Sequence, residues 1–97
     1  MAFNADYLTC MNDIGITKPN IWLYKTTDAA ATVDTAGYFS TGYGFKVGDL
    51  IYRVTVDSLT LDNSATVSTA GWHVVMAVSS TSVDVSDTTA LTVTNTD

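Results

Sequence analysis

The stretch Leu50–Asp57, which reads LIYRVTVD, decides the fold class of this 97-residue chain. Its side chains alternate between an apolar set and a mixed set, namely Leu50, Tyr52, Val54 and Val56 against Ile51, Arg53 and Thr55. A period of two is the repeat of a β-strand, because successive side chains of a strand point to opposite faces. The stretch therefore predicts a strand with one apolar face and one mixed face.

The composition of the whole chain indicates the same structural class. Thr occurs 17 times and Val 11 times, and both residues are stiff at χ1 and favour strands. Neither Glu nor Gln occurs, so the long unbranched polar side chains that cover helix surfaces are nearly absent. We therefore expect an all-β domain, built as a small β-barrel or a β-sandwich.

Further strands are expected on both sides of this stretch. Ile21–Tyr24 is rich in β-branched and aromatic residues, and Thr66–Val78 is the longest β-like segment. Within that segment, Gly71 indicates either a bulge or a close approach of another part of the backbone. Val83–Val85 and Ala90–Thr94 predict two short final strands.

One short helix is expected at Asp28–Ala36. Asp28 would cap the run Ala29-Ala30-Ala31, which has the best helix-forming composition in the chain, and Gly37 would end the helix.

Residues 1–20 form a lead-in to a single β domain at residues 21–97. The lead-in is either an extended N-terminal arm that orders against a neighbour or a short helix. In the second case Asn4 or Asp6 would cap a helix that runs through Met11, and Gly15 would end it.

The size and charge of the chain limit its partners. At 97 residues there is room for one hydrophobic core, and association with other subunits would add stability. The net charge is −6, and the four cations are too few and too scattered to neutralise a phosphate track. We therefore expect no nucleic-acid partner and no anionic membrane, whereas a basic protein surface remains possible.

The cellular compartment is suggested by three expected absences. The single Cys10 excludes an internal disulfide and a cysteine-based metal cluster. No apolar run approaches the ~20 residues that span a bilayer, and the start of the chain lacks the pattern of a signal peptide. We therefore expect a protein that folds in a reducing cytoplasm.

No residue pattern indicates catalysis, a cofactor or a metal. His73 is the only histidine, and no spacing supplies the nucleophile or further ligands that it would need, so a structural role is expected. Asp28, Asp34 and Asp49 lack the spacing of a calcium loop, and capping and turn roles explain them. We therefore expect a protein that is not an enzyme and binds no cofactor or metal.

The aromatic residues are the main candidates for core and interface. Trp22 and Trp72 are expected in the core of the domain. The interface candidates are Tyr7, Tyr38, Phe39, Tyr43 and Phe45, of which the last two lie in a glycine-rich loop.

Two segments of the chain resemble each other. ATVDTAGYF at Ala31–Phe39 and ATVSTAGWH at Ala65–His73 agree at six of nine positions. The match reflects either coincidence or shared turn chemistry, or else the duplication of a strand-turn unit.

The stretch Thr26–Val54 carries a resemblance to a known family. It combines a run of small residues led by Asp28, the turn Gly37-Tyr38-Phe39, and a strand entered through Val47-Gly48-Asp49. This arrangement resembles small virion proteins of tailed bacteriophages that are encoded with the head genes and act as capsid decoration or cement subunits.

The resemblance implies a location and a partner. The protein would be made in the cytoplasm of a bacterial host and bind the outside of the phage capsid as a homotrimer. There it would bridge neighbouring copies of the major capsid protein. The alternatives are a tail-tip, fibre-base or head-to-tail component of the virion, or a carbohydrate-binding β module.

Overall fold

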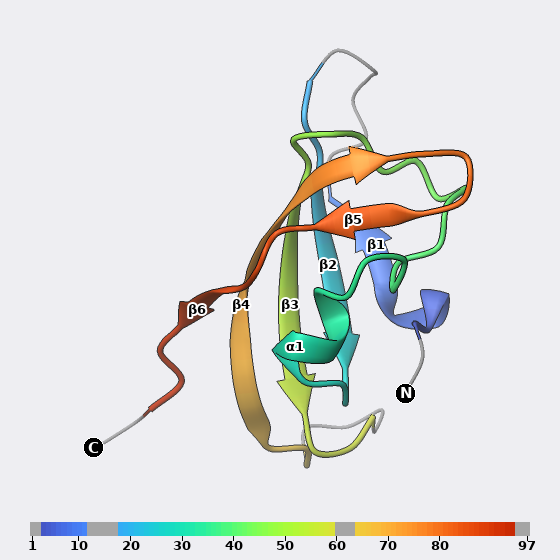
Figure 1. Ribbon diagram of the computed structural model, residues 1–97. Helices are drawn as coiled ribbons and strands as arrows, with labels where there is room; N and C mark the ends of the chain where they lie inside the picture. The colour runs from blue at the N-terminus through green and yellow to red at the C-terminus, as the bar shows by residue number, and fades with distance from the viewer. Residues whose placement is uncertain (1–2, 12–17, 60–63, 95–97) are drawn as a thin grey trace.

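The computed structural model describes residues 3–11, 18–59 and 64–94. Its elements are mainly strands, joined by one short α-helix and one 3-10 turn (Figure 1). In chain order they are η1 (Ala5–Tyr7), β1 (Leu8–Cys10), β2 (Ile21–Thr26), α1 (Ala30–Val33), β3 (Leu50–Val56), β4 (Val67–Val78), β5 (Val83–Val85) and β6 (Thr89–Leu91).

The strands form one open mixed sheet with the order β1-β2-β3-β4-β5, and β6 pairs with β4 beside this path. The pair β2 and β3 is parallel, while the other pairs are antiparallel. The expected mainly β architecture is confirmed, but the expectation of a closed barrel or a sandwich is wrong. The three-residue strands β1 and β5 lie at opposite ends of the strand order, so the sheet does not close.

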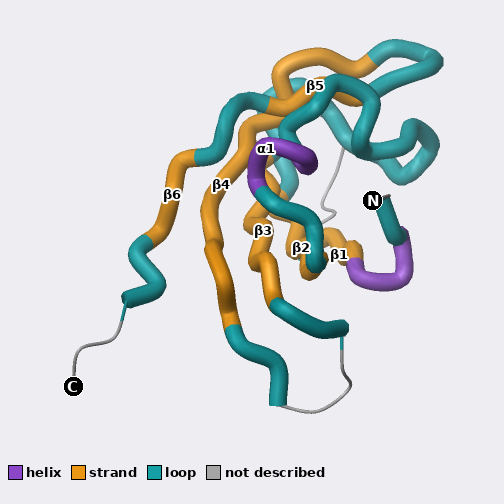
Figure 2. Tube along the Cα trace, turned by 60° about the horizontal axis from the view of Figure 1, so that its bottom comes forward, coloured by secondary structure: helices purple, strands orange, loops and turns teal. Residues whose placement is uncertain are grey.

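The parallel pair requires a crossover, and residues 27–49 supply it. Helix α1 lies in this crossover, on one side of β2 and β3 (Figures 1 and 2). The predicted helix is confirmed in place but is shorter than expected, because Thr32 and Val33 are β-branched and Gly37 already has φ +83°. The expected cap is wrong, since the N-cap residue is Ala29, whose side chain makes no capping hydrogen bond.

The N-terminal lead-in differs from both expectations over residues 3–10. Asn4 caps the 3-10 turn η1 by accepting a hydrogen bond from the Asp6 amide. The chain then continues as strand β1, which pairs with β2 from Leu8 opposite Tyr24 to Cys10 opposite Trp22. This segment is therefore an edge of the sheet, neither a free arm nor an α-helix through Met11. The expected helix end at Gly15 lies outside the described residues.

The face of the sheet beneath α1 forms the hydrophobic core, which we call the covered face. Trp22 and Tyr24 of β2 contribute large side chains, and Phe39 and Phe45 of the crossover pack against them. The ring centroids of Trp22 and Phe45 are 4.3 Å apart. The remaining buried hydrophobic members of this core are Val33, Ile51, Val75, Val83 and Val85.

Strand β3 buries its mixed set of side chains and leaves Leu50, Tyr52 and Val54 of its apolar set half-buried, whereas Val56 at its end is buried. Ile51, Arg53 and Thr55 are all buried on the covered face, and Arg53 is only 1% exposed. The predicted strand is therefore confirmed, but a charged residue lies in the core where an aliphatic one would be the simpler choice.

For Gly71 of strand β4, the sequence predicts either a bulge or a close approach of another part of the backbone. A Cβ on Gly71 would lie 2.8 Å from the carbonyl oxygen of Thr89, which confirms a close approach of the backbone. The irregularities of register lie elsewhere, between Thr55 and Val56 of β3 and between Val75 and Ala77 of β4.

The two similar segments of sequence fold differently. Ala31–Phe39 contains most of α1 and the turn after it, whereas Ala65–His73 leads into and forms the first half of β4. The match is therefore not a duplicated structural unit.

Candidate functional site

The face of the sheet opposite α1 carries a continuous apolar surface, which we call the open face. Strand pairing aligns its side chains in three rows across the sheet. The rows are Ile21, Leu50 and Val74; then Thr9, Leu23, Tyr52, Trp72 and Thr89; then Lys25, Val54, Ala70 and Leu91.

Charge and exposure distinguish the open face from the covered face. Lys25 is the only charged residue in the three rows, although the chain carries a net charge of −6. Leu23 and Val74 remain 36% and 38% exposed, and Leu91 is 37% exposed. A contiguous exposed apolar surface on a soluble domain marks a place where another molecule binds. We therefore take the open face as the candidate site.

Two aromatic rings form the centre of this face. Tyr52 and Trp72 are directly opposite in the pairing of β3 and β4, with ring centroids 5.5 Å apart and planes inclined by 59°. Both side chains are half-buried by their neighbours. Aromatic residues at the centre of an interface contribute much of the binding energy. Because their planes are inclined, the two rings do not make one flat platform.

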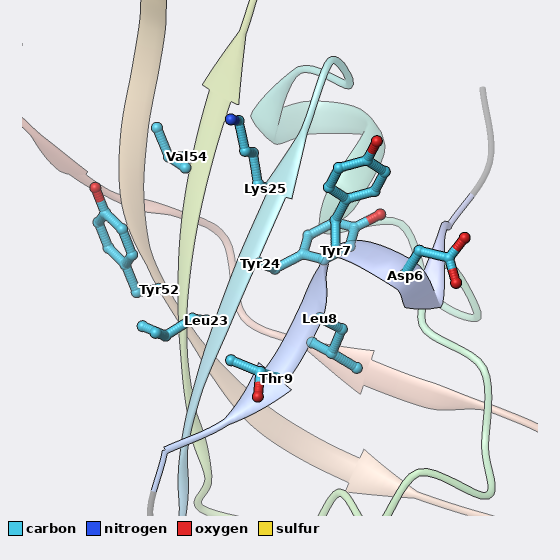
Figure 3. A pocket seen from close by; sticks show the side chains of 9 residues that line it. All are labelled: Asp6, Tyr7, Leu8, Thr9, Leu23, Tyr24, Lys25, Tyr52 and Val54. Carbon is cyan, nitrogen blue, oxygen red and sulfur yellow. The ribbon is translucent and has the colours of Figure 1, made fainter. Parts of the chain in front are cut away.

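A shallow groove of about 330 Å³ borders the open face at its β1 edge (Figure 3). Tyr7 and Tyr52 stand on either side of β2 in this view, and the charges of the groove are Asp6 and Lys25. Its lining residues are Asp6, Tyr7, Leu8, Thr9, Leu23, Tyr24, Lys25, Tyr52 and Val54.

On the covered face, the Arg53 guanidinium lies among neutral acceptors. Its Nη1 donates to the hydroxyls of Thr55 and Thr69, and its Nη2 donates to the Thr88 hydroxyl over 3.3 Å. Within the described part of the chain, no carboxylate lies within ion-pair distance of Arg53. Burial lowers the pKa of Arg53, although a guanidinium remains charged at neutral pH.

His73 completes the surroundings of this arginine and is fully buried. Its Nε2 accepts from Arg53 Nε over 3.1 Å, and its Nδ1 lies 3.0 Å from the carbonyl oxygen of Ser86. Because Arg53 Nε can only donate, Nε2 is the bare nitrogen and Nδ1 carries the proton. Burial is the main cause that lowers the pKa of His73, and the charge of Arg53 adds to it. The structural role that the sequence predicts for His73 fits this arrangement.

A second polar group links the crossover to β2. The Tyr38 hydroxyl donates to Asp28 Oδ2 over 2.7 Å and lies 2.7 Å from the Tyr24 hydroxyl. Since Tyr38 donates its only proton to Asp28, Tyr24 is the donor to Tyr38. Burial and these hydrogen bonds raise the pKa of Tyr38.

The structure separates the five aromatic interface candidates. Phe39 and Phe45 are 1% and 6% exposed in the core, so they present almost no surface to a partner. Tyr43 is 46% exposed, and Tyr7 and Tyr38 are half-buried. Tyr7 alone among the five lines the groove beside the open face.

The two tryptophans also differ from each other. Trp22 is a core residue, as expected. The same expectation is wrong for Trp72, which lies half-buried on the open face opposite Tyr52. Tyr52, Trp72 and Leu23 of the candidate site were not among the interface residues expected from the sequence. For Tyr52 a signal was present, because it belongs to the apolar set of the alternating stretch Leu50–Asp57.

Asp28, Asp34 and Asp49, the three aspartates considered for calcium, have separate structural roles. Asp49 is buried and accepts from the Trp22 indole, while Asp28 accepts from Tyr38 and Asp34 ends α1. Within residues 3–11, 18–59 and 64–94, no three His, Cys, Asp or Glu side chains come together in a group that could hold a metal ion.

Comparison of the chain with protein-family models, with curated proteins and with solved structures finds no match. Of the helices in the described ranges, none has the length and apolar character that crossing a membrane requires.

Proposed function

We propose that this protein is a structural virion protein, a capsid decoration or cement subunit that binds the outside of a tailed-phage head. It would stabilise contacts between major capsid proteins and act without enzymatic chemistry. Its location would be the capsid surface, after synthesis in the cytoplasm of the bacterial host.

The open face is the observation that carries the proposal. An uncharged row through Leu23, Tyr52 and Trp72 has the composition of an interface core, where charged residues are depleted and aromatic residues enriched. A protein that covers this face would remove a large apolar surface from water, at roughly 25 cal/mol per Å² of buried area.

The resemblance over Thr26–Val54 supports the phage assignment and concerns mainly the crossover on the other side of the molecule, although Leu50, Tyr52 and Val54 of this stretch lie on the open face. These residues form the end of β2, the crossover and most of β3. Two aromatic residues of this stretch, Phe39 and Phe45, lie in the hydrophobic core. The resemblance therefore concerns mainly residues that build the fold, which we call the scaffold. The open face is the surface that this scaffold presents.

A homotrimer is part of the same proposal, because the resemblance implies one on the capsid. A 97-residue domain has a small core, and association stabilises whatever it buries. Light scattering at micromolar concentration measures the state in solution, and particle reconstructions measure it on the capsid. A protein that is monomeric in solution and sits singly on particles would contradict the trimer.

The test of the proposal is a charge placed on the open face. Leu23→Asp puts a carboxylate in the middle of that surface, where a partner would have to desolvate it. Val47→Asp is the matched control, because Val47 is 65% exposed in the crossover loop, outside the sheet. We expect both variants to fold, and only Leu23→Asp to lose binding to heads that lack the protein.

The function of a clamp has its own readout. Bare heads, heads with the original protein and heads with each variant are heated, and DNA release is followed by a dye. We expect release at a higher temperature for the original protein and Val47→Asp. Equal release temperatures for bare and decorated heads would favour the alternative of a tail-tip, fibre-base or head-to-tail component.

The aromatic pair on the open face gives one observation in favour of a carbohydrate-binding module. Tyr52 and Trp72 lie half-buried on this face with ring centroids 5.5 Å apart, and aromatic rings at a surface can stack on sugars. Retention of the protein on immobilised glycans, with loss of retention in Trp72→Ala and no binding to heads, would support this second function instead.

A further inference from the structure

The C-terminal segment is attached to the sheet at the Arg53–His73 pair. Ser86 exchanges two hydrogen bonds with Val74: its amide donates to the Val74 carbonyl over 2.8 Å, and its hydroxyl accepts from the Val74 amide over 2.9 Å. Its carbonyl oxygen faces His73 Nδ1 at 3.0 Å. Two residues later, the Thr88 hydroxyl accepts from Arg53. The pair therefore contacts the segment at two points.

Beyond Thr88, the segment buries little apolar surface that could hold it on the sheet. The three residues of β6, Thr89, Ala90 and Leu91, are all exposed, and β6 lies on the side of β4 away from β3 (Figure 1). Among the described strands, β6 pairs only with β4. Hydrogen bonds at Ser86 and Thr88 thus contribute much of what keeps the segment in place.

The hydrogen bond between Arg53 and His73 exists only while the imidazole is neutral. A proton on Nε2 would replace the acceptor by a donor, so that two N–H groups face each other where 3.1 Å now separates donor and acceptor. It would also place two cations side by side in a buried site. The cost of an unpaired buried charge is large enough to move a weakly held segment.

We propose that Arg53 and His73 form an acid-sensitive latch, and that protonation of His73 releases the segment Ser86–Leu91 from β4. Release would leave the edge of β4 at Ala70–Trp72 without its partner strand, because these residues are the ones that β6 covers. Arg53 and His73 lie on the covered face, and the latch does not depend on the proposed role on the capsid. Thr89 and Leu91 of the released segment belong to the open face, so release would also change that surface.

Charged groups near His73 come from β3, from the end of α1 and from the segment itself. Its neighbour on β3 is Arg53, whose charge opposes protonation. Asp34 after α1 and Asp87 within the segment favour the charged imidazole. Neither carboxylate forms an ion pair with His73 or Arg53 in the described structure, so burial prevails.

The sign of the pH dependence follows from this balance. The pKa of His73 in the folded protein is below the ordinary value of about 6.5, so the open form binds the proton more tightly than the latched form. The latch is therefore intact above pH ~6.5. Its closing constant falls as the pH drops further, by at most about tenfold per pH unit for one proton.

His73 is the only histidine, so its imidazole signal in an NMR spectrum is unambiguous. The experiment records this signal from pH 7.5 to 4.5 together with amide exchange, expressed as protection factors. The Ser86 amide reports the latch, and the Leu50 amide, which donates to Asn20 at the start of β3, reports the body of the sheet. We expect Ser86 to lose at least tenfold in protection as His73 titrates, while Leu50 keeps its protection.

Two variants separate the latch from general acid denaturation. His73→Gln keeps an acceptor for Arg53 without a titrating proton, so the pH dependence of Ser86 protection should disappear. Ser86→Ala removes one hydrogen bond at every pH, so it should lower protection of its own amide equally at pH 7.5 and 5.5. If His73→Gln does not fold, the titration of the original protein still decides. Equal losses at Ser86 and Leu50, or a titration of His73 without any change at Ser86, would overturn the latch.

Discussion

The indole Nε1–H of Trp22 donates to Oδ2 of Asp49 over 2.9 Å, and both side chains are buried. The same carboxylate accepts from the backbone amides of Asn20 and Lys46 at 2.9 and 3.0 Å. Beside it, the Leu50 amide donates to the Asn20 carbonyl. One aspartate thus joins the beginnings of the two parallel strands β2 and β3, which are separated by the whole crossover.

Replacing this carboxylate by a carboxamide should destabilise the fold. In Asp49→Asn the NH₂ group faces at least one of three N–H donors, which is then buried without an acceptor. We expect a loss of about 3 kcal/mol in the free energy of unfolding, measured by urea denaturation. The matched control Asp87→Asn alters an exposed carboxylate and should stay within about 0.5 kcal/mol. Similar losses in both variants would mean that only net charge matters.

Gly71 should be the least replaceable glycine of the chain's described part. A Cβ there meets the Thr88 hydroxyl, the Thr89 carbonyl oxygen and, at 3.3 Å, the Arg53 guanidinium. Gly71→Ala should therefore cost at least about 2 kcal/mol, as overpacking does. Gly42→Ala is the control, because its Cβ enters open space and only the positive φ of +94° costs about 1 kcal/mol. If Gly42→Ala lowers the free energy of unfolding more than Gly71→Ala does, the backbone at Thr89 does not approach Gly71 as closely as described.

The glycine-rich loop contains one core residue and one surface residue. Phe45→Ala removes a ring that packs against Trp22, so we expect a loss of about 3–5 kcal/mol in the free energy of unfolding. Tyr43→Ala removes a half-exposed ring whose described aromatic neighbour is Phe3, and should cost about 1 kcal/mol. Thermal and urea denaturation measure both. Comparable losses would show that the loop packs differently.

Alkaline pH should destabilise the protein through Tyr38. The pKa of its phenol is raised in the folded state, so the stabilising effect is complete below the unfolded value of about 10 and is lost as the pH rises above it. We expect the urea midpoint to fall between pH 10 and 11. Absorbance of phenolate, compared with that of Tyr38→Phe, should show Tyr38 ionising only as the protein unfolds.

Tyr38→Phe serves as the control for this pH dependence. The variant should be less stable at pH 7 by about 1–3 kcal/mol, since Asp28 loses its donor and Tyr24 its acceptor. It should lose less stability than the original protein between pH 10 and 11. An unchanged slope in the variant would assign the alkaline effect to another group.

The sequence by itself determined the structural class and most of the strands. The alternation in Leu50–Asp57, the β-rich run Ile21–Tyr24 and the long segment Thr66–Val78 all lie where strands β3, β2 and β4 are found. Such patterns are local, and Thr and Val favour strands, so these segments could be recognised without knowledge of their partners.

Only the tertiary structure decided which face of β3 is buried. Local alternation separates two sets of side chains but does not say which set receives the crossover. Arg53 is accommodated in the core because distant parts of the chain supply its hydrogen-bond acceptors. His73 is 20 positions from Arg53 in the sequence, and Thr88 is 35 positions away. The buried and open faces, and with them Tyr52 and Trp72 as site residues, could not be read from the stretch alone.

The sequence ATV-x-TAG occurs twice in the chain and adopts two different conformations. In Ala31–Phe39 this sequence begins in helix α1 and continues through a turn, and in Ala65–His73 it enters strand β4. The intrinsic preferences of the shared residues are identical, and they are small compared with the energy of packing. Strand β4 forms because β3 and β6 offer backbone partners on both sides of it, whereas α1 forms where the crossover must cover the core. Tertiary contacts therefore decide between helix and strand for this sequence, and local sequence patterns do not reveal those contacts.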